Sequence, residues 1–350
     1  MFETVKYLMG SAGASGYGSK STGEQVVSVV DLHSSTAIIT GATSGIGAET
    51  ARVLAKRGAR LVIPARNLKA AEETKARITL EFPETEIIVM RLDLSSLKSV
   101  KSFVSDFEAL NLPLNLLINN AGKFAYDHGI SEDGIEMTFA TNYLGHFLLT
   151  KLLLKKMIET AKTTGIQGRI VNVSSGIHTW FSGDLIRSLG QITRDKSHYD
   201  ATRAYAISKL ANVLHTKELA RRLQSGYVIT RSLFTLNNTE SNGGKCDCKL
   251  CTSWGCENWT HKRSGRFHHR FVFFLTSKFL KTIPQAAATT CYVATHPELR
   301  NVSGKYFADC NEATNSKIGC NPKEAARLWS FSEIMVSTDW KSVFGAFSIA

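Results

Sequence analysis

The chain has 350 residues, 43% of them hydrophobic and 21% charged, which is the composition of an ordinary soluble globular protein. No apolar run reaches the roughly 18 residues of a membrane-spanning helix, so an integral membrane protein is not expected. The formal net charge is +12, but residues 245–270 hold six Lys and Arg against one Asp and one Glu and so supply +4 of it. With that segment set aside the charge is modest, and nucleic-acid binding is not expected.

The two ends of the chain differ in character from its middle. The first 28 residues are rich in Gly and Ser and poor in acids, so we expect residues 1–34 to be a flexible tail, with an organellar targeting peptide as the alternative. One domain is expected over 35–320, and a C-terminal helix and tail over 321–350. Within the latter, 322–336 carries an apolar stripe at helical spacing, which packs on the core or, alternatively, meets a partner.

Apolar, β-rich runs alternate with amphipathic stretches from residue 36 to residue 223. The expected strands are 36–40, 59–65, 86–92, 114–119 and 168–174. The expected helices are 48–57, 70–82, 97–110, 135–160 and 203–223. This alternation predicts an α/β fold of one domain, with a doubly wound parallel sheet of the Rossmann type, whose ligands lie at the carboxyl ends of the strands.

Residues 40–47 read TGATSGIG and form a glycine-rich turn between a strand and a helix. Gly41 lets the chain turn sharply, while Gly45 and Gly47 let the backbone approach a phosphate, which the free amides at the start of the helix attract. The turn predicts a nucleotide cofactor. Its candidate contacts are Gly41, Thr43, Ser44, Gly45, Ile46 and Gly47.

The ends of the next two strands bear on the choice of cofactor. A carboxylate after the second strand would hold a ribose 2′-hydroxyl, but Arg66 and Asn67 stand there. A guanidinium suits a 2′-phosphate, so Arg66 favours NADP(H) over NAD(H), unless it is simply a solvated Arg. After the third strand, Asp93 and Leu94 are placed to contact the adenine; Asp93 alternatively caps the helix that follows.

Tyr205 and Lys209 are four residues apart and share one face of a helix. A nearby ammonium stabilises a phenolate and lowers the phenol pKa from its usual value near 10, which would make Tyr205 an acid and base near neutral pH. About 30 residues earlier a strand ends in Ser174 and Ser175. We expect Ser175 to hydrogen-bond a substrate carbonyl oxygen and Ser174 to be structural.

These motifs resemble the short-chain dehydrogenase/reductase family over residues 36–223 and again from about 271. The resemblance includes the Asn-Asn-Ala-Gly run at 119–122 and Asn142. It implies that Asn120, Ala121 and Gly122 line the cofactor site together with Tyr205 and Lys209. It also implies a catalytic tetrad that transfers hydride between NADP(H) and a carbonyl or alcohol: Asn142, Ser175, Tyr205 and Lys209.

The sequences of residues 139–147 and 205–214 are similar to those of the retinol-dehydrogenase-like and WW-domain-oxidoreductase-like branch of the family. Within that branch, residues 284–293 and the Gly/Ser-rich head most resemble plant proteins akin to the short-chain dehydrogenase of the chloroplast inner-envelope import translocon. This resemblance implies a peripheral site at the inner chloroplast envelope, with the cytoplasm as the alternative. It further implies import-translocon partners and calmodulin. A rival to the enzyme is therefore a weakly active or inactive NADP-binding protein that senses redox state or acts as a scaffold at that envelope.

The family pattern breaks over residues 225–270. The family continues into a strand and a Pro-Gly turn against the nicotinamide, but no Pro-Gly follows the β-rich run 227–234. Four cysteines crowd there instead, at 246, 248, 251 and 256, with histidines at 261, 268 and 269. Four thiolates could hold zinc, but their spacing is not that of paired knuckles, and we expect no metal.

A shift of the reading frame by one base explains this segment better. With free choice of codons, the shifted frame over residues 245–270 can encode the strand and Pro-Gly turn that the family requires. We therefore hypothesise that 243–270 is a frame-shifted translation and that 225–242 is inserted sequence. In that case the run 227–234 substitutes for the missing strand by accident, and the chain is expected to bind NADP(H) weakly and to turn over poorly.

Overall fold

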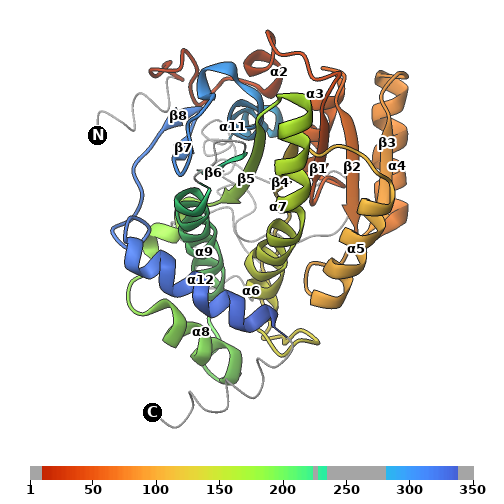
Figure 1. Ribbon diagram of the computed structural model, residues 1–350. Coiled ribbons are helices and arrows are strands. Elements are labelled where there is room, and N and C mark those ends of the chain that lie inside the picture. Colours follow the sequence, from red (N-terminus) through yellow and green to blue (C-terminus); the bar gives the residue numbers. More distant parts are fainter. Residues whose placement is uncertain (1–9, 224–227, 235–280, 338–350) are drawn as a thin grey trace, which may run out of the picture.

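The computed structural model describes residues 10–223, 228–234 and 281–337. The described strands are β1 (Thr36–Ile39), β2 (Arg60–Ala65), β3 (Ile87–Arg91), β4 (Leu116–Asn119), β5 (Gly168–Ser174), β6 (Val228–Phe234), β7 (Tyr306–Ala308) and β8 (Asn311–Glu312). They form one 8-stranded sheet in the order β3-β2-β1-β4-β5-β6-β7-β8 (Figure 1). The pairs from β3 to β7 are parallel and β8 runs antiparallel to β7. The expected parallel, doubly wound sheet is confirmed.

Helices connect the strands and cover both faces of the sheet. The longer ones are α3 (Gly45–Ala55), α4 (Leu68–Glu81), α5 (Leu97–Ala109), α7 (Gly145–Thr164), α8 (Leu185–Arg194), α9 (Ala201–Arg222), α11 (Ile283–Thr295) and α12 (Pro322–Val336). Short helical turns are α2 (Gly23–Val26), α6 (Met137–Phe139), a π-helical turn (Ala140–Leu144) and two 3₁₀ turns (Gly176–Trp180 and Pro297–Leu299). Among the helices in the described ranges, none has the length and apolar character needed to cross a membrane.

Side chains of a strand alternate between two hydrophobic clusters, one on each face of the sheet. Ile38 and Val62 belong to the cluster with α5, α7, α9 and α12, whereas Ile39 and Ile63 belong to the cluster with α3, α4 and α11. All four are fully buried. A strand buried on both faces reads as a continuous apolar run, and this is why β1, β2, β4 and β5 were visible in the sequence, whereas β3 is a partly exposed edge strand.

The elements expected between residues 36 and 223 are confirmed to within a few residues at their ends, and the helix expected over 322–336 is α12. Its stripe is buried, with Ala325, Leu328 and Trp329 in the hydrophobic core, so it packs on the core rather than facing a partner. The helix α8 lies in a stretch for which no helix was expected. The cysteines of the zinc alternative and the hypothesised frame-shifted segment lie outside the described residues. The division at residues 34 and 320 stays a prediction.

Part of the N-terminal segment, for which a flexible tail was expected over 1–34, packs on the domain, and its contacts in the described residues include those of Ser15 and Tyr17. The helix α2 begins with a capping box in which the side chains of Thr22 and Gln25 bond each other's backbone amides. Val26 and Val27 are fully buried in the cluster that contains α3 and α11. The two valines stabilise this packing because their apolar surface is removed from water. The high Gly and Ser content of the segment gave no sign that these two side chains would be buried.

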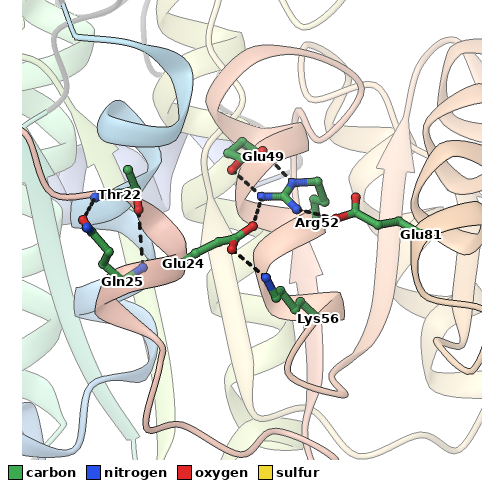
Figure 2. Close-up of polar contacts among 7 residues, drawn as sticks. All are labelled: Thr22, Glu24, Gln25, Glu49, Arg52, Lys56 and Glu81. Carbon is green, nitrogen blue, oxygen red and sulfur yellow. Dashed lines mark hydrogen bonds and ion pairs between the residues drawn. The ribbon is translucent and has the colours of Figure 1, made fainter.

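An ion-pair network holds α2 against the domain (Figure 2). The Arg52 guanidinium in α3 contacts three carboxylates, Glu24 at 2.5 Å, Glu81 at 2.7 Å and Glu49 at 2.9 Å. Lys56 contacts the second oxygen of Glu24 at 2.6 Å. A single exposed ion pair contributes little to stability. Here one partly buried guanidinium joins α2, α3 and α4, so the entropy cost of ordering its side chain is spread over three contacts.

The sixth strand is the β-rich run that follows the break in the family pattern. It pairs with β5 along its whole length, from Val228 opposite Gly168 to Phe234 opposite Ser174. Its central residue is Arg231, whose side chain is only 1% exposed. The guanidinium donates to the carbonyl oxygens of Val302 at 2.9 Å and Val293 at 2.5 Å and to that of Leu299.

Arg231 is a buried charge without a carboxylate partner among the residues that the structure describes. Burial and the nearby Arg169 lower the pKa of Arg231 to about 9. A buried cation that faces only carbonyl dipoles costs several kcal/mol of desolvation, of which the hydrogen bonds return a part.

We predict that Arg231→Met raises the free energy of unfolding by about 1 kcal/mol, because removal of an uncompensated charge outweighs the three lost hydrogen bonds. Arg231→Lys keeps a charge, loses the planar fork of donors and is expected to be less stable than the wild type by a similar amount. Chemical denaturation monitored by circular dichroism measures both. If the Lys variant is more stable than the Met variant, the hydrogen bonds outweigh the charge.

Candidate active site

The glycine turn between β1 and α3 is closed by contacts that leave no room for side chains. Gly41 has φ +67°, and a Cβ atom there would lie 2.7 Å from the Cα atom of Ala121. A Cβ atom on Gly47 would lie 2.2 Å from the carbonyl oxygen of Gly41. The helix α3 begins at Gly45, φ +54°, and Ser44 before it makes no side-chain cap. The first amides of α3 are therefore available to an anion, and the turn fits a phosphate.

The segment after β4 is fastened to this turn. Asn120 Nδ2 donates to the carbonyl oxygen of Thr40 at 2.9 Å. The Thr40 hydroxyl oxygen accepts the amide protons of Asn120 at 3.0 Å and Ala121 at 2.9 Å. One residue further, a Cβ atom on Gly122 would lie 3.4 Å from Lys209 Nζ. The structure thus brings the glycine turn, the Asn-Ala-Gly segment and Lys209 to one edge of the sheet.

The residues expected at the adenosine end lie at the ends of β2 and β3. Arg66 directly follows β2 and is exposed. Asn67 is the N-cap of α4, with its side-chain oxygen accepting from the Ala70 amide at 3.3 Å. Asp93 Oδ1 accepts from the amide of Ser95 at 2.9 Å and from its hydroxyl at 2.7 Å. Asn67 thus caps α4, whereas the N-cap of α5 is Ser96 and not Asp93, so the capping alternative for Asp93 is not found. Arg66 keeps a solvent-facing position, and the cofactor contacts of all three residues stay predictions.

Tyr205 and Lys209 lie side by side on α9, with Lys209 Nζ 5.5 Å from the centroid of the Tyr205 ring. Lys209 Nζ donates to the carbonyl oxygen of Val173 at 3.1 Å. Burial lowers the pKa of Lys209 to about 8. Burial also raises the pKa of Tyr205 well above its usual range, which a hydrogen bond with Ser175 partly opposes. The expected lowering of the phenol pKa is therefore not found in the described structure, because desolvation of the phenolate dominates.

Asn142 lies in the π-helical turn and is fully buried. Its Oδ1 accepts from the Lys123 amide at 2.7 Å, and its Nδ2 donates to the Lys123 carbonyl oxygen at 2.9 Å and to Ser208 Oγ at 3.1 Å. The side chain therefore clamps the segment after β4 to α9. It fixes the next residue, Phe124, whose ring meets Tyr205 edge-on with centroids 5.5 Å apart.

Ser174 has a structural contact, as expected, because its hydroxyl donates to the Lys209 carbonyl oxygen at 2.8 Å inside the core. Asn119 is also structural. Its Nδ2 donates to Asn172 Oδ1 on β5 at 2.8 Å, and Asn172 in turn donates to Thr216 on α9 at 2.9 Å. These buried bonds hold β4, β5 and α9 in one register, so the side chains that project from them keep fixed relative positions.

Several residues of this site were not expected from the sequence. Gly145 at the start of α7 approaches the segment after β3 so closely that a Cβ atom there would lie 2.2 Å from the carbonyl oxygen of Leu94. The contact of the glycine turn with α4 was also not expected: the carbonyl oxygen of Thr43, itself a predicted cofactor contact, accepts from Thr74 Oγ1 at 3.3 Å. Further contacts come from Thr40, Lys123, Phe124, His146 and Ser208. Gly145 and His146 lie in the family-like run 139–147, and this was the one available signal.

One groove on the described surface lies away from these residues. It measures about 1300 Å³ and runs between α8, the connection to α9, and α12. Its lining includes Asp184, Arg187, Arg194, Arg203, Arg327 and Phe331. The connection that precedes the Tyr-Lys helix therefore lines this groove, whereas Tyr205, Ser175 and Lys209 do not.

Comparison with known proteins gives consistent matches. A family model described as short chain dehydrogenase matches residues 35–180. The chain is 47% identical over 337 residues to the short-chain dehydrogenase TIC 32 A, chloroplastic, of Brassica napus, covering 96% of this chain and 99% of that protein. It is 36% identical over 316 residues to retinol dehydrogenase 12 of Bos taurus, covering 89% of each.

A solved structure of an uncharacterized protein from Mycobacterium paratuberculosis is similar with a TM-score of 0.64 at 26% identity. The similarity covers 90% of this chain and 98% of that one. The matches extend over nearly the whole length of the chain, on both sides of the segment where the family pattern breaks.

We predict that Gly145→Ala lowers the free energy of unfolding by about 1–3 kcal/mol, because its Cβ atom would meet backbone that cannot move aside. Gly190→Ala in α8 is the matched control. Its Cβ atom would meet nothing closer than the end of the Arg194 side chain at 3.5 Å, so a change of about 0.5–1 kcal/mol toward stability is expected. Equal losses in urea denaturation would contradict the close approach of α7 to the segment after β3.

Proposed function

The chain belongs to the short-chain dehydrogenase/reductase family, and we propose that it transfers hydride between NADP(H) and a carbonyl or alcohol substrate, with Tyr205 as proton donor and acceptor. The observation that carries the proposal is the convergence of Tyr205, Lys209 and Ser175 beside Gly122 and the glycine turn. Family membership supports an oxidoreductase with a nicotinamide cofactor. The phosphorylated form of the cofactor, the four catalytic residues and the cofactor contacts are inferred from the residues present.

The residues fit such a cofactor. The cradle in which Gly41 and Gly47 allow no Cβ atom, next to the free amides of α3, suits a pyrophosphate. Gly122 and Lys209 at the other end of the same edge suit the nicotinamide ribose. Exposed Arg66 at the end of β2 suits a 2′-phosphate, which a carboxylate in its place would repel. A bound nicotinamide supplies or accepts the hydride.

The protein supplies proton transfer and orientation. In the direction of reduction, the Tyr205 hydroxyl gives its proton to the substrate oxygen, which the Ser175 hydroxyl holds by a second hydrogen bond. With a pKa of about 8, Lys209 is mostly charged at neutral pH and stabilises the phenolate that forms. Tyr205 is only 8% exposed, and Phe124 lies against its ring, so water has little access to the transferred proton.

A second candidate is favoured by the sequence after β6, where no Pro-Gly turn follows. A chain without that wall would bind NADP(H) weakly and act as a redox-sensing or scaffold protein.

The chloroplast is the proposed location, since the Brassica napus relatives are chloroplastic by name. A peripheral position at the inner envelope, with import-translocon partners and calmodulin, belongs to the same proposal. Fractionation of chloroplasts into envelope and stroma tests it, and recovery in the cytosol would oppose it.

We predict that Arg66→Ala weakens NADPH binding about tenfold and leaves NADH binding unchanged, because the guanidinium contacts only the 2′-phosphate. Fluorescence titration of the reduced cofactors measures both Kd values. Arg60→Ala is the control, since Arg60 lies at the opposite end of β2 and pairs with Glu86 at 2.5 Å. An unchanged NADPH affinity in the Arg66 variant would assign Arg66 to solvent.

We predict that Tyr205→Phe lowers kcat for carbonyl reduction by about 10²–10⁴-fold, the usual contribution of a general acid, with little change in NADPH affinity. The change removes one hydroxyl and keeps the ring that packs on Phe124. Stopped-flow reduction and cofactor titration measure the two effects. If plants that carry only this variant show no defect, while the variant still binds NADPH, the scaffold candidate is favoured.

A further inference from the structure

His146 connects two parts of the site that are distant in the sequence. It is the second residue of α7 and is 1% exposed. Its Nδ1 lies 3.0 Å from the carbonyl oxygen of Asn142, one helical turn earlier. Its Nε2 lies 2.8 Å from the hydroxyl oxygen of Thr40, the last residue before the glycine turn. One imidazole ring therefore spans from the turn with Asn142 to the cofactor edge of the sheet.

The hydrogen bonds determine the protonation of this ring. A carbonyl oxygen only accepts, so Nδ1 carries the proton and donates to Asn142. The Thr40 oxygen already accepts the amide protons of Asn120 and Ala121, which use both of its lone pairs. Its own proton has two acceptors within reach, His146 Nε2 at 2.8 Å and the Ile118 carbonyl oxygen at 3.4 Å. The shorter contact favours His146, and a protonated Nε2 would find no lone pair on Thr40, so we assign Nε2 as the unprotonated acceptor. Burial and the charge of Lys209 act in the same direction, because they lower the pKa of His146 to about 4.

We propose that His146, as the neutral Nδ1–H tautomer, is a positioning residue that couples the cofactor edge at Thr40 to the catalytic turn at Asn142. Through Thr40 it orients the hydroxyl to which Asn120 and Ala121 are fastened. Through the Asn142 carbonyl it fixes the turn whose side chain clamps Lys123. The inference rests on the proposed function, since it assigns His146 a role at the same site.

A second buried histidine provides a comparison within the same core. His215 on α9 is 3% exposed and packs among the rings of Tyr143, Phe147 and Trp329. Its Nδ1 has no hydrogen-bond partner in the part of the chain that the structure describes. The two imidazoles are thus matched in burial, but only His146 is bonded to both halves of the site. Variants of either histidine lose buried packing of the imidazole ring. Only variants of His146 also lose the coupling between the two halves of the site.

The tautomer is tested without cofactor by NMR on protein labelled with ¹⁵N in histidine. An unprotonated Nε2 and a protonated Nδ1 have separate ¹⁵N shifts, and we expect this pattern for His146 from pH 6 to pH 8. The signal is assigned by its disappearance in His146→Asn. A protonated Nε2, or an imidazolium in that range, would overturn the inference whatever the activity of the protein.

Two substitutions separate the two bonds. In His146→Asn the side-chain amide takes the place of Nδ1 and keeps the donor to Asn142, but Thr40 loses its acceptor. We expect the Kd for NADPH to rise about tenfold. In His146→Gln the side-chain oxygen takes the place of Nε2 and keeps the acceptor for Thr40. We expect near-normal NADPH binding and a kcat about tenfold lower, with the substrate KM little changed.

His215→Asn is the control and is expected to lower the thermal unfolding midpoint while both kinetic quantities stay within about twofold. Equal changes in NADPH affinity in the Asn variants of His146 and His215 would show that His146 only fills space. Wild-type protein that binds NADPH normally, together with unchanged His146 variants, overturns this inference alone. Wild-type protein that does not bind NADPH overturns the proposed function and the cofactor part of the inference together.

Discussion

The Thr40 hydroxyl is the contact on which the arrangement of the site depends. It lies where β1 ends, and its oxygen accepts two consecutive amides from the segment after β4. These bonds hold β1 and β4 together at their carboxyl ends, where each strand continues into a loop. The close approach of Gly41 to Ala121 follows from them. In a doubly wound sheet the chain leaves β1 and β4 in opposite directions, and ligands bind in the crevice between these connections, so the Thr40 bonds fix the floor of that crevice.

From that point the order of the site extends through buried polar groups. Asn142 ties the segment after β4 to α9, and Asn119 and Asn172 tie β4 to β5 and α9. Each buried polar atom in this chain of bonds must find a partner or lose free energy, so the bonds select one register of helices on strands. Tyr205 and Lys209 inherit their positions from that register. The hydrophobic clusters stabilise the domain, but they tolerate sliding more readily than directional bonds do.

The sixth strand shows how far a β-prone segment can satisfy a sheet. Val228 to Phe234 pairs with β5 along its whole length, because backbone hydrogen bonds between strands place few demands on side-chain identity. The side chains are less well suited, since the buried Arg231 guanidinium has only carbonyl oxygens as partners among the described residues. The ladder of β6 on β5 is thus continuous, while its packing leaves a buried charge without a counterion in the part of the chain that the structure describes.

The sequence by itself determined the sheet, the glycine turn and the Tyr-Lys pair, because these depend on local spacing: apolar runs, one flexible turn, and residues four apart on a helix. It also indicated Arg66, which follows a strand end. Only the tertiary structure decided the roles of Thr40, Gly145 and His146, since each acts through a contact with a residue distant in the chain. The same holds for the pKa of Tyr205, where burial by other elements reversed the direction that its neighbour Lys209 alone would impose.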